Sequence, residues 1–277
     1  MTRETLLFLH DPSTGGAALV GLAAILALTT AVWISSLPLR DASLIDRFWG
    51  FAFVVLAWVY FVAAPHGGAP GARHWLVPVL ATLWGLRLSV YLTWRNWGQG
   101  EDFRYVQMRQ RNPSFAWTSL IKVFWFQAAI AWIVGLPLLQ VQRVDRPESL
   151  VWLDLLGVVF FATGFLFEAI GDLQLTRFKA DPDNRGRVLD TGLWRYTRHP
   201  NYFGNAMIWW GFALIALATP GGWWSLIGPA VMTFFLVRIS GVMLLEKTLV
   251  ETKPAYRDYV RRTSAFFPRP PRAADGG

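Results

Sequence analysis

The chain has 277 residues, of which 54% are hydrophobic and only 16% are charged, and its formal net charge is +8. Average soluble domains contain about 25% charged residues, so this composition favours a lipid bilayer over water as the main solvent. No cysteine is present, which excludes disulfides, thiolate nucleophiles and cysteine-based zinc or iron–sulfur sites. The four histidines lie far apart without a zinc-binding spacing, so we expect no metal site.

The positive charge does not favour nucleic acid as a partner. Lys and Arg fall in the segments that flank long apolar runs, where membrane topology accounts for them. The first apolar run, which begins near Gly15, is too long for the core of a signal peptide. We therefore interpret it as a retained membrane helix.

Seven apolar runs are long enough to cross a bilayer core, which needs about 20 helical residues. They cover residues 15–37, 48–65, 75–93, 115–138, 149–172, 202–219 and 223–245. Lys and Arg accumulate after the third, fifth and seventh run, so the positive-inside rule places the N-terminus outside and the C-terminus in the cytoplasm. We predict an all-α, polytopic integral membrane protein with seven transmembrane helices in one domain, residues 1–270, followed by a disordered tail at 271–277.

The connecting segments carry local predictions of their own. Residues 102–111 follow a glycine-rich turn and read as a short helix. The fifth run continues into water until the segment 181–184, DPDN, breaks it. The last two runs are joined by the tight turn TPGG at 219–222, which predicts a helical hairpin. Near the end, aromatic residues at 256, 259 and 266 have the spacing of a short amphipathic segment that lies on the membrane.

Two acidic residues, Glu168 and Asp172, lie four residues apart in the fifth run and therefore share one helical face. An ionisable side chain at the centre of a membrane helix costs at least about 2.5–3.5 kcal/mol, so it normally faces a partner or a wet cavity. One interpretation is a purely structural pairing with Arg87 or Arg238. The other is a polar pocket at the cytoplasmic mouth that holds a ligand rich in hydroxyl and amide groups.

The stretch GLWRYTRHPNYFGN, residues 192–205, precedes the sixth run. Pro200 suits the first turn of a helix, and a helix N-terminus attracts anions, with Arg198 and His199 just ahead of it. Arginines of two loops, interleaved with aromatic residues, suit the phosphates of an adenosine diphosphate. The alternative is an interfacial aromatic belt with a positive flank. Rossmann and P-loop fingerprints are both absent from the sequence.

Motifs over most of the chain resemble one known group of membrane proteins. They are SLIDRFWG at 43–50, LRL at 86–88 with Tyr91 and Arg95, GEDFRY at 100–105, Glu168 with Asp172 and Gln174, the stretch 192–205, and Tyr256, Tyr259, Thr263, Phe266 and Pro268. Together they resemble the steroid 5-alpha-reductase-like family, in particular its bacterial branch of unknown function related to the 3-oxo-5-alpha-steroid 4-dehydrogenases. The resemblance implies a seven-helix fold that binds NADPH from the cytoplasmic side, with the cofactor half at about residues 95–268.

The resemblance also implies cofactor contacts at Glu168, Asp172, Arg187 and Asn201, whereas Asn205 replaces a glutamate of the family. Together with the polar residues of the two loops, these give one predicted cofactor site. Its residues are Arg95, Asp102, Arg104, Tyr105, Glu168, Asp172, Lys179, Arg187, Tyr196, Arg198, His199, Asn201 and Tyr202.

The Gln-Glu pair with which the family holds a steroid carbonyl has no counterpart here, which argues against a 3-oxo-steroid substrate. We predict Asp46 and Tyr91 as catalytic residues, because Asp46, if partly desolvated, could donate a proton and Tyr91 lies on the neighbouring run. The reaction would pass a hydride to an electron-poor alkene, while a hydrogen-bond donor stabilises the charge on the activating oxygen.

We therefore expect an NADPH-dependent reductase of a conjugated carbon–carbon double bond in a steroid-like or isoprenoid lipid. One alternative is an S-adenosylmethionine-dependent lipid or isoprenylcysteine-type methyltransferase, since such enzymes share the Arg-His-Pro-x-Tyr-x-Gly string and usually carry a later Glu-Glu pair, where this chain has Glu246-Lys247. A second alternative is a non-catalytic lipid-binding membrane protein. We expect a monomer or weak oligomer in the bacterial inner membrane, in contact with membrane lipids and a lipophilic substrate.

Overall fold

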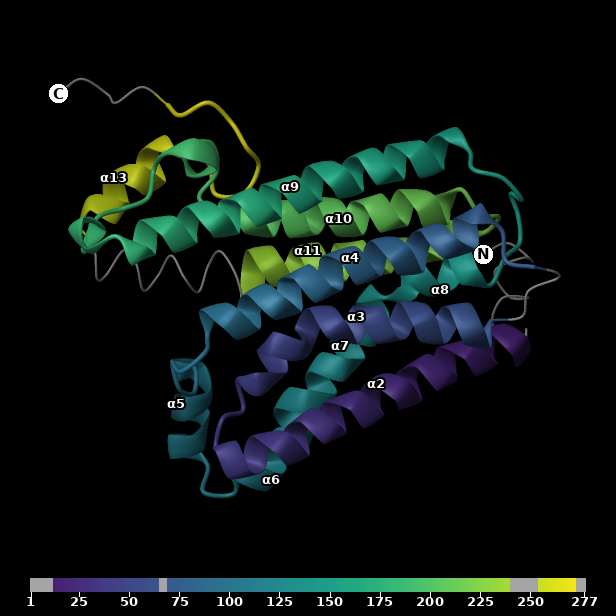
Figure 1. The fold of residues 1–277 in the computed structure, drawn as a ribbon, viewed down its shortest axis with the longest axis horizontal. Helices are drawn as coiled ribbons and strands as arrows, with labels where there is room; N and C mark the ends of the chain where they lie inside the picture. Colours follow the sequence, from purple (N-terminus) through teal and green to yellow (C-terminus); the bar gives the residue numbers. More distant parts are fainter. Residues whose placement is uncertain (1–11, 65–68, 240–253, 273–277) are drawn as a thin grey trace. The chain divides into compact units, whose positions relative to one another are not determined.

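A computed structural model describes residues 12–64, 69–239 and 254–272 (Figure 1). Within these ranges the chain forms helices and no strand, which confirms the all-α prediction. Six helical segments among the described residues are long and apolar enough to cross a membrane, so the protein is a multi-pass membrane protein. They are Gly15–Leu39, Leu44–Ala63, Ala72–Arg95, Phe115–Val134, Trp152–Ala180 and Gly222–Ile239.

The predicted run at 202–219 forms helix α10 (Pro200–Leu217), which is not one of these six segments. Its first two turns contain Pro200, Asn201, Tyr202 and Asn205, and these residues lower the mean hydropathy of the helix. The run predicted at 223–245 is helical as far as Ile239, and its remainder lies outside the described residues. Seven transmembrane helices and an outside N-terminus therefore stay predictions.

The chain divides into two compact units, the first of which contains Met1–Asp154 and Ile215–Gly228. Its helices are α2 (Pro12–Leu39), α3 (Leu44–Ala63), α4 (Ala72–Arg95), α5 (Phe103–Arg111), α6 (Phe115–Ser119), α7 (Phe126–Val134) and α8 (Leu136–Gln142), with a π-helical turn at Leu120–Trp125. In Figure 1 α2, α3 and α4 run side by side, and α5 stands at the end where α2 finishes and α3 begins. The backbones of α3 and α4 come into close contact at Gly50 and Gly85. A Cβ added to Gly50 would lie only 2.5 Å from the carbonyl oxygen of Gly85, so a larger residue would not fit there.

Helix α2 ends in a Schellman motif built on an unusual residue. The Asp41 N–H donates to the Ser36 carbonyl and the Arg40 N–H to the Leu37 carbonyl, both at 3.2 Å. Arg40 takes the left-handed position with φ +50°, and it is the one non-glycine residue with positive φ among those the structure describes. Glycine is the usual residue there, because a side chain in this conformation costs about 1–2 kcal/mol.

A buried ion pair lies at the opposite end of this unit. The Arg73 Nε donates to Asp154 Oδ2 at 2.9 Å, and the two side chains are only 2% and 0% exposed. The Arg73 Nη2 also donates to the Ile215 carbonyl at 2.7 Å. Arg73 therefore ties α4 to two later segments of the unit.

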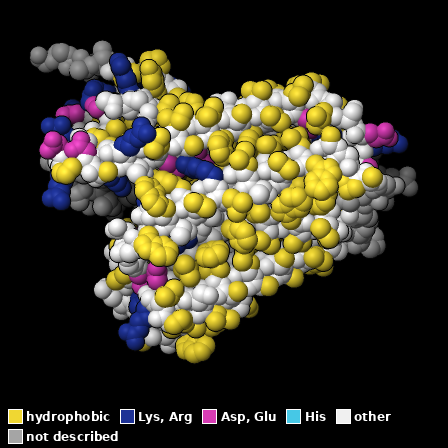
Figure 2. Space-filling model, viewed as in Figure 1, with side chains coloured by type: hydrophobic (Ala, Val, Ile, Leu, Met, Phe, Trp, Pro, Cys, Tyr) yellow, Lys and Arg dark blue, Asp and Glu magenta, His cyan; other side chains and the backbone are white. Residues whose placement is uncertain are grey.

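The second unit contains Leu155–Leu214 and Pro229–Gly277. Most of α9 (Trp152–Ala180) and α10 belong to it, with α11 (Ile227–Phe234), its π-helical extension to Ile239, and α13 (Pro254–Arg262). Trp210 Nε1 donates to Thr233 Oγ1 at 3.2 Å, which supports the predicted hairpin of the last two runs. Figure 2 shows hydrophobic side chains spread along the helices, while most charged side chains gather near helix ends.

Glycines set the distance between α9 and α10. A Cβ on Gly204 would lie 2.5 Å from the backbone nitrogen of Glu168, and one on Gly211 would lie 2.7 Å from the Gly157 carbonyl oxygen. These glycines allow backbone-to-backbone contact of the kind that holds membrane helices together. The contact places the first turns of α10 directly on the two acidic residues of α9.

We expect Gly204→Ala to lower the stability of the protein by about 1–3 kcal/mol, because the new methyl group overlaps rigid backbone and must push α9 and α10 apart. Thermal unfolding in detergent, followed by tryptophan fluorescence, measures this. Gly16→Ala is the matched control, since Gly16 is exposed on α2 and its Cβ would meet nothing within 4 Å. Equal melting temperatures for Gly204→Ala and the control would contradict the close helix contact.

Candidate functional site

Asp46, in the first turn of α3, is the centre of a polar cluster in the first unit. Its Oδ2 accepts a hydrogen bond from Arg104 Nη2 at 2.9 Å, and its Oδ1 accepts one from the Tyr105 hydroxyl at 2.9 Å. The Gln127 amide nitrogen lies 3.4 Å from the same Oδ1 and 3.2 Å from the Tyr105 oxygen. Asp46, Tyr105 and Gln127 thus form a closed triangle, called the polar triangle below. The accessible part of this cluster is formed by Asp46 and its partner Arg104, whose side chains are 27% and 33% exposed.

Backbone contacts between two loops bring these side chains together. The Ala42 N–H donates to Glu101 Oε1 at 2.8 Å, and the Asp102 N–H donates to Ser43 Oγ at 3.3 Å. Asp102 then caps α5, because its Oδ1 accepts from the Arg104 N–H at 3.0 Å. The motifs SLIDRFWG and GEDFRY, which the sequence analysis treated separately, therefore form one structure. The short helix predicted at 102–111 is confirmed as α5.

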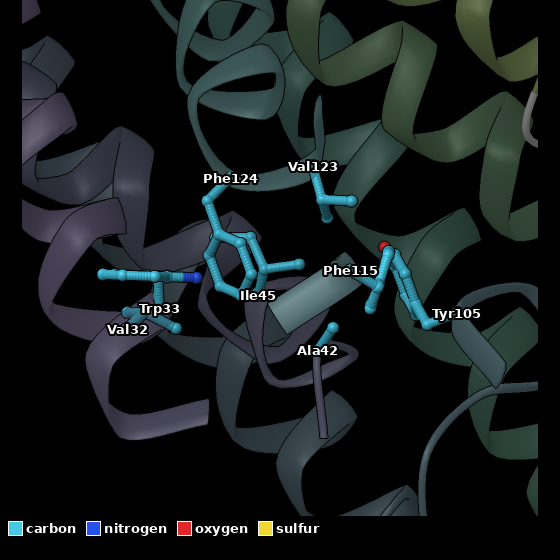
Figure 3. Close-up of a cluster of buried hydrophobic side chains, with 8 residues drawn as sticks. All are labelled: Val32, Trp33, Ala42, Ile45, Tyr105, Phe115, Val123 and Phe124. Carbon is cyan, nitrogen blue, oxygen red and sulfur yellow. The ribbon is translucent and has the colours of Figure 1, made fainter. Parts of the chain in front are cut away.

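The Tyr105 ring is held in a buried apolar cluster that joins five helical segments and the loop before α3 (Figure 3). The cluster contains Val32, Trp33, Ala42, Ile45, Tyr105, Phe115, Val123 and Phe124. Burial, and next the negative charge of Asp46, raises the pKa of the Tyr105 hydroxyl above its ordinary value. The hydroxyl therefore keeps its proton at neutral pH and acts as a hydrogen-bond donor.

Gln127 connects the polar triangle to the apolar interior. It borders a cavity of about 10 Å³ that is otherwise lined by side chains such as Leu28, Phe48 and Trp49. In this conformation the cavity has room for about one water molecule. The sequence analysis missed Gln127, although a single amide inside an apolar run is the signal by which it could have been found.

The predicted residues of α4 lie beside the same loops. Tyr91 is flanked by two guanidinium groups, with the Arg87 and Arg95 carbons 5.1 and 5.5 Å from its ring centre. Burial opposes ionisation of Asp102, but the hydrogen bonds and charge of Arg104, together with Arg95, outweigh it and lower the pKa of the Asp102 carboxyl.

In the second unit the start of α10 meets the acidic face of α9. Glu168 and Asp172 are each 3% exposed, and Asp172 Oδ1 accepts a hydrogen bond from Asn201 Nδ2 at 3.1 Å. Helix α10 begins at Pro200 as predicted, and the Pro200 ring packs on Gly171. The buried Asn205 side chain has an Oδ1 with no hydrogen-bond partner among the described residues.

The tail forms a clamp on the loop before α10. The buried Arg198 guanidinium donates to the carbonyl oxygens of Val260, at 3.0 Å, and Thr263. The Tyr259 hydroxyl donates to the Trp194 carbonyl, and the Thr197 hydroxyl donates to the Phe266 carbonyl at 2.8 Å.

These contacts correct the prediction that the tail aromatics lie on the membrane. Tyr256, Tyr259 and Phe266 are 5%, 2% and 7% exposed, so their apolar face is covered by the protein itself. The same contacts direct the Nη1 of Arg198 at two backbone carbonyls of the tail. The neighbouring His199 and Tyr202 rings stack with their centres 5.4 Å apart.

The predicted site residues thus fall into two groups, one in each unit. The first unit holds Asp46, Tyr91, Arg95, Asp102, Arg104 and Tyr105. The second holds Glu168, Asp172, Lys179, Arg187, Tyr196, Arg198, His199, Asn201 and Tyr202. Of the second group, Lys179, Arg187 and Tyr196 are exposed. That both groups bind one ligand stays a prediction.

Comparison with known proteins identifies the class. A family model described as "Protein of unknown function (DUF1295)" matches residues 32–263, and the chain belongs to this family. It is 28% identical over 99 residues to a steroid 5-alpha-reductase of Gossypium hirsutum, a match that covers 36% of this chain and 34% of that relative. The family resemblance drawn from the motifs is thereby confirmed.

Two further relatives were found. An uncharacterized protein of Schizosaccharomyces pombe is 26% identical over 282 residues, covering 90% of this chain and 79% of the relative. A probable O-methyltransferase of Ustilaginoidea virens is 29% identical over 113 residues, covering 41% of this chain and 34% of the relative. No solved structure matches the chain.

The lowered pKa of Asp102 predicts a pH-dependent contribution to stability. Because the folded-state pKa lies below the unfolded value of 3.8, the contribution is present above that value and is lost as the pH falls through the folded-state pKa. We expect Asp102→Asn to be less stable than the wild type above about pH 4 and to converge with it at lower pH. Melting temperatures between pH 3 and 7 test this.

Asn also caps helices well, so Asp102→Asn removes mainly the charge. In an Arg104→Gln background, the loss of stability caused by Asp102→Asn should shrink at every pH, because Arg104 is the principal partner of the carboxylate. An undiminished loss in that background would assign the effect to another group.

Proposed function

We propose that the protein is a membrane-embedded, NADPH-dependent reductase of a conjugated carbon–carbon double bond in a lipophilic substrate. The observation that carries this proposal is the polar triangle, which sets a protonated hydroxyl and an amide beside an apolar interior. The similarity to a steroid 5-alpha-reductase supports an oxidoreductase of this general kind. We propose the bacterial cytoplasmic membrane as its location and a monomer or weak oligomer as its state.

Residues of the triangle have the chemistry that such a reduction requires. When bound, NADPH supplies the hydride that is transferred to the alkene. Gln127 can donate an N–H to the activating oxygen of the substrate, where negative charge develops, and the one proton of the Tyr105 hydroxyl, now donated to Asp46, can be redirected to the same oxygen. Asp46 orients the Tyr105 hydroxyl at 2.9 Å, and this pair is the proposed source of the proton that completes the reduction. Asp46 is thus proposed as the partner of Tyr105.

The second unit has groups that fit a nucleotide cofactor. The Asn205 Oδ1, which has no partner among the described residues, and the buried carboxylates of Glu168 and Asp172 are acceptors suited to ribose hydroxyl and adenine amino groups. The exposed Arg187 is a cation suited to phosphates. We propose that these residues hold the cofactor and that Asn201 fixes the Asp172 carboxylate among them.

A methyltransferase is the second candidate, and the similarity to a probable O-methyltransferase favours it. The same acceptors would suit the amino and hydroxyl groups of S-adenosylmethionine. The Glu246-Lys247 position, where these enzymes usually carry a Glu-Glu pair, lies outside the described residues.

Titration of the detergent-purified protein with NADPH and with S-adenosylmethionine separates the two candidates. We expect saturable NADPH binding, read from tryptophan and nicotinamide fluorescence, and no competition by S-adenosylmethionine. Asn201→Ala should weaken NADPH binding about tenfold or more, because it leaves the Asp172 carboxylate without its amide partner. Gln110→Ala, an exposed change on α5, should leave binding unchanged. Tight binding of S-adenosylmethionine alone would instead support the methyltransferase.

Tyr105→Phe tests the proton source. We expect kcat for NADPH oxidation with a series of lipophilic α,β-unsaturated ketones to fall about 100-fold or more, since general acid catalysis contributes about 10²–10⁴. NADPH affinity should stay within about twofold of the wild type, since the proposed cofactor acceptors of the second unit are unaltered. A variant with full activity would show that another group supplies the proton.

A further inference from the structure

A second cavity, separate from the polar triangle, lies in the first unit where α2 ends beside α5 and α6. Its volume is about 310 Å³, which is within the range of small-molecule sites, about 300–1,000 Å³. Two arginines, Arg40 and Arg109, line it together with an apolar side formed by Leu37, Pro113 and Phe115. Such a mixture of cationic and apolar walls is suited to an amphiphile with an anionic head.

Arg109 has a fixed position and spare donor capacity. Its Nε and Nη2 donate to the two Glu101 oxygens at 3.0 and 2.7 Å, and its guanidinium carbon lies 4.9 Å from the Phe115 ring centre. A guanidinium has five N–H donors, and the pair with Glu101 uses only those of Nε and Nη2. The Nη1 donors therefore remain for a ligand in the cavity that Arg109 lines. The Glu101 side chain is the buried member of this ion pair and is only 9% exposed.

Arg40 adds a positive charge that local acids do not neutralise. The adjacent Asp41 pairs with Arg47 at 2.9 Å, and no ion pair of Arg40 is found in the part of the chain that the structure describes. Arg40 also occupies the left-handed position of the Schellman motif, where glycine would avoid the strain of a positive φ. A strained residue of this kind is often retained because its side chain serves a ligand.

The position of the cavity on α2 leads us to expect it at the depth of the lipid headgroups. Helix α2 is apolar and long enough to span the bilayer, and the cavity lies at its last turn. Exposed apolar side chains continue from the cavity along the same end of the unit, with Leu39 64% and Trp117 71% exposed. A soluble phosphate compound would gain no binding free energy from this apolar surface. A phospholipid would, because its acyl carbons would be buried against it.

We propose that Arg40 and Arg109 bind the phosphate of an anionic phospholipid at this cavity. Arg40 offers a guanidinium fork, which phosphate oxygens accept bidentately, and Arg109 adds the Nη1 donors that its pair with Glu101 leaves over. The apolar wall receives the first carbons of the acyl chains. The site therefore selects phospholipids of net negative charge over zwitterionic ones. In phosphatidylcholine the positive trimethylammonium group would be repelled by the same two arginines.

Native mass spectrometry of the full chain tests the site, with phosphatidylglycerol and phosphatidylcholine as probes at equal concentration. We expect the wild type to retain phosphatidylglycerol about tenfold more than phosphatidylcholine. Arg40→Ala and Arg40→Gly should each reduce this preference to about twofold or less, and Arg109→Gln should act in the same direction. Arg111→Gln, the same charge change on an exposed residue of α5, should keep the preference.

The two Arg40 variants separate lipid binding from folding. Arg40→Gly removes the guanidinium but relieves the positive φ, so its melting temperature should equal or exceed that of Arg40→Ala. Loss of the lipid preference in both variants would therefore assign the effect to the side chain. Retention of the preference in both would overturn the proposal, as would inorganic phosphate that displaces phosphatidylglycerol at millimolar concentration.

Discussion

The need to pair a carboxylate at the start of a membrane helix organises one end of this protein. Asp46 lies in the first turn of α3, a helix long and apolar enough to cross a membrane, and an ionisable group there needs donors from the protein. Arg104 and Tyr105 supply them from α5, and Gln127 approaches from α7. Because these donors come from two segments, α5 and α7, the pairing holds the start of α3 against both of them. That structure then carries both the polar triangle and the cavity of Arg40 and Arg109.

The second unit meets the same constraint in another way. Glu168 and Asp172 are buried on α9, and glycines in both helices let the start of α10 approach them closely. Asn201 supplies an amide to Asp172 across this contact. The loop before α10 is in turn held by the tail, through Arg198 and Tyr259. A segment far along the chain thus determines where the first turn of α10 lies.

A reductase and a methyltransferase make similar demands on such a protein. Both need a polar nucleotide site beside an apolar chamber, and the relatives of this chain include proteins named for each activity. The polar triangle is what favours the reductase. Hydride transfer to a conjugated alkene needs a donor for the developing oxygen charge and a proton, and Tyr105 beside Asp46 and Gln127 can supply both.

The sequence by itself determined the helical class, the membrane environment, the family and several local features. The helix α5, the break after Ala180 and the start of α10 at Pro200 all follow from short-range rules of capping, proline geometry and apolar run length. The tertiary structure alone decided which polar groups meet. Gln127 reaches Asp46 across 81 residues, Arg73 pairs with Asp154, and the tail aromatics turn into the protein. Such contacts depend on which faces of distant helices pack together, and the periodicity of a single run does not contain that information.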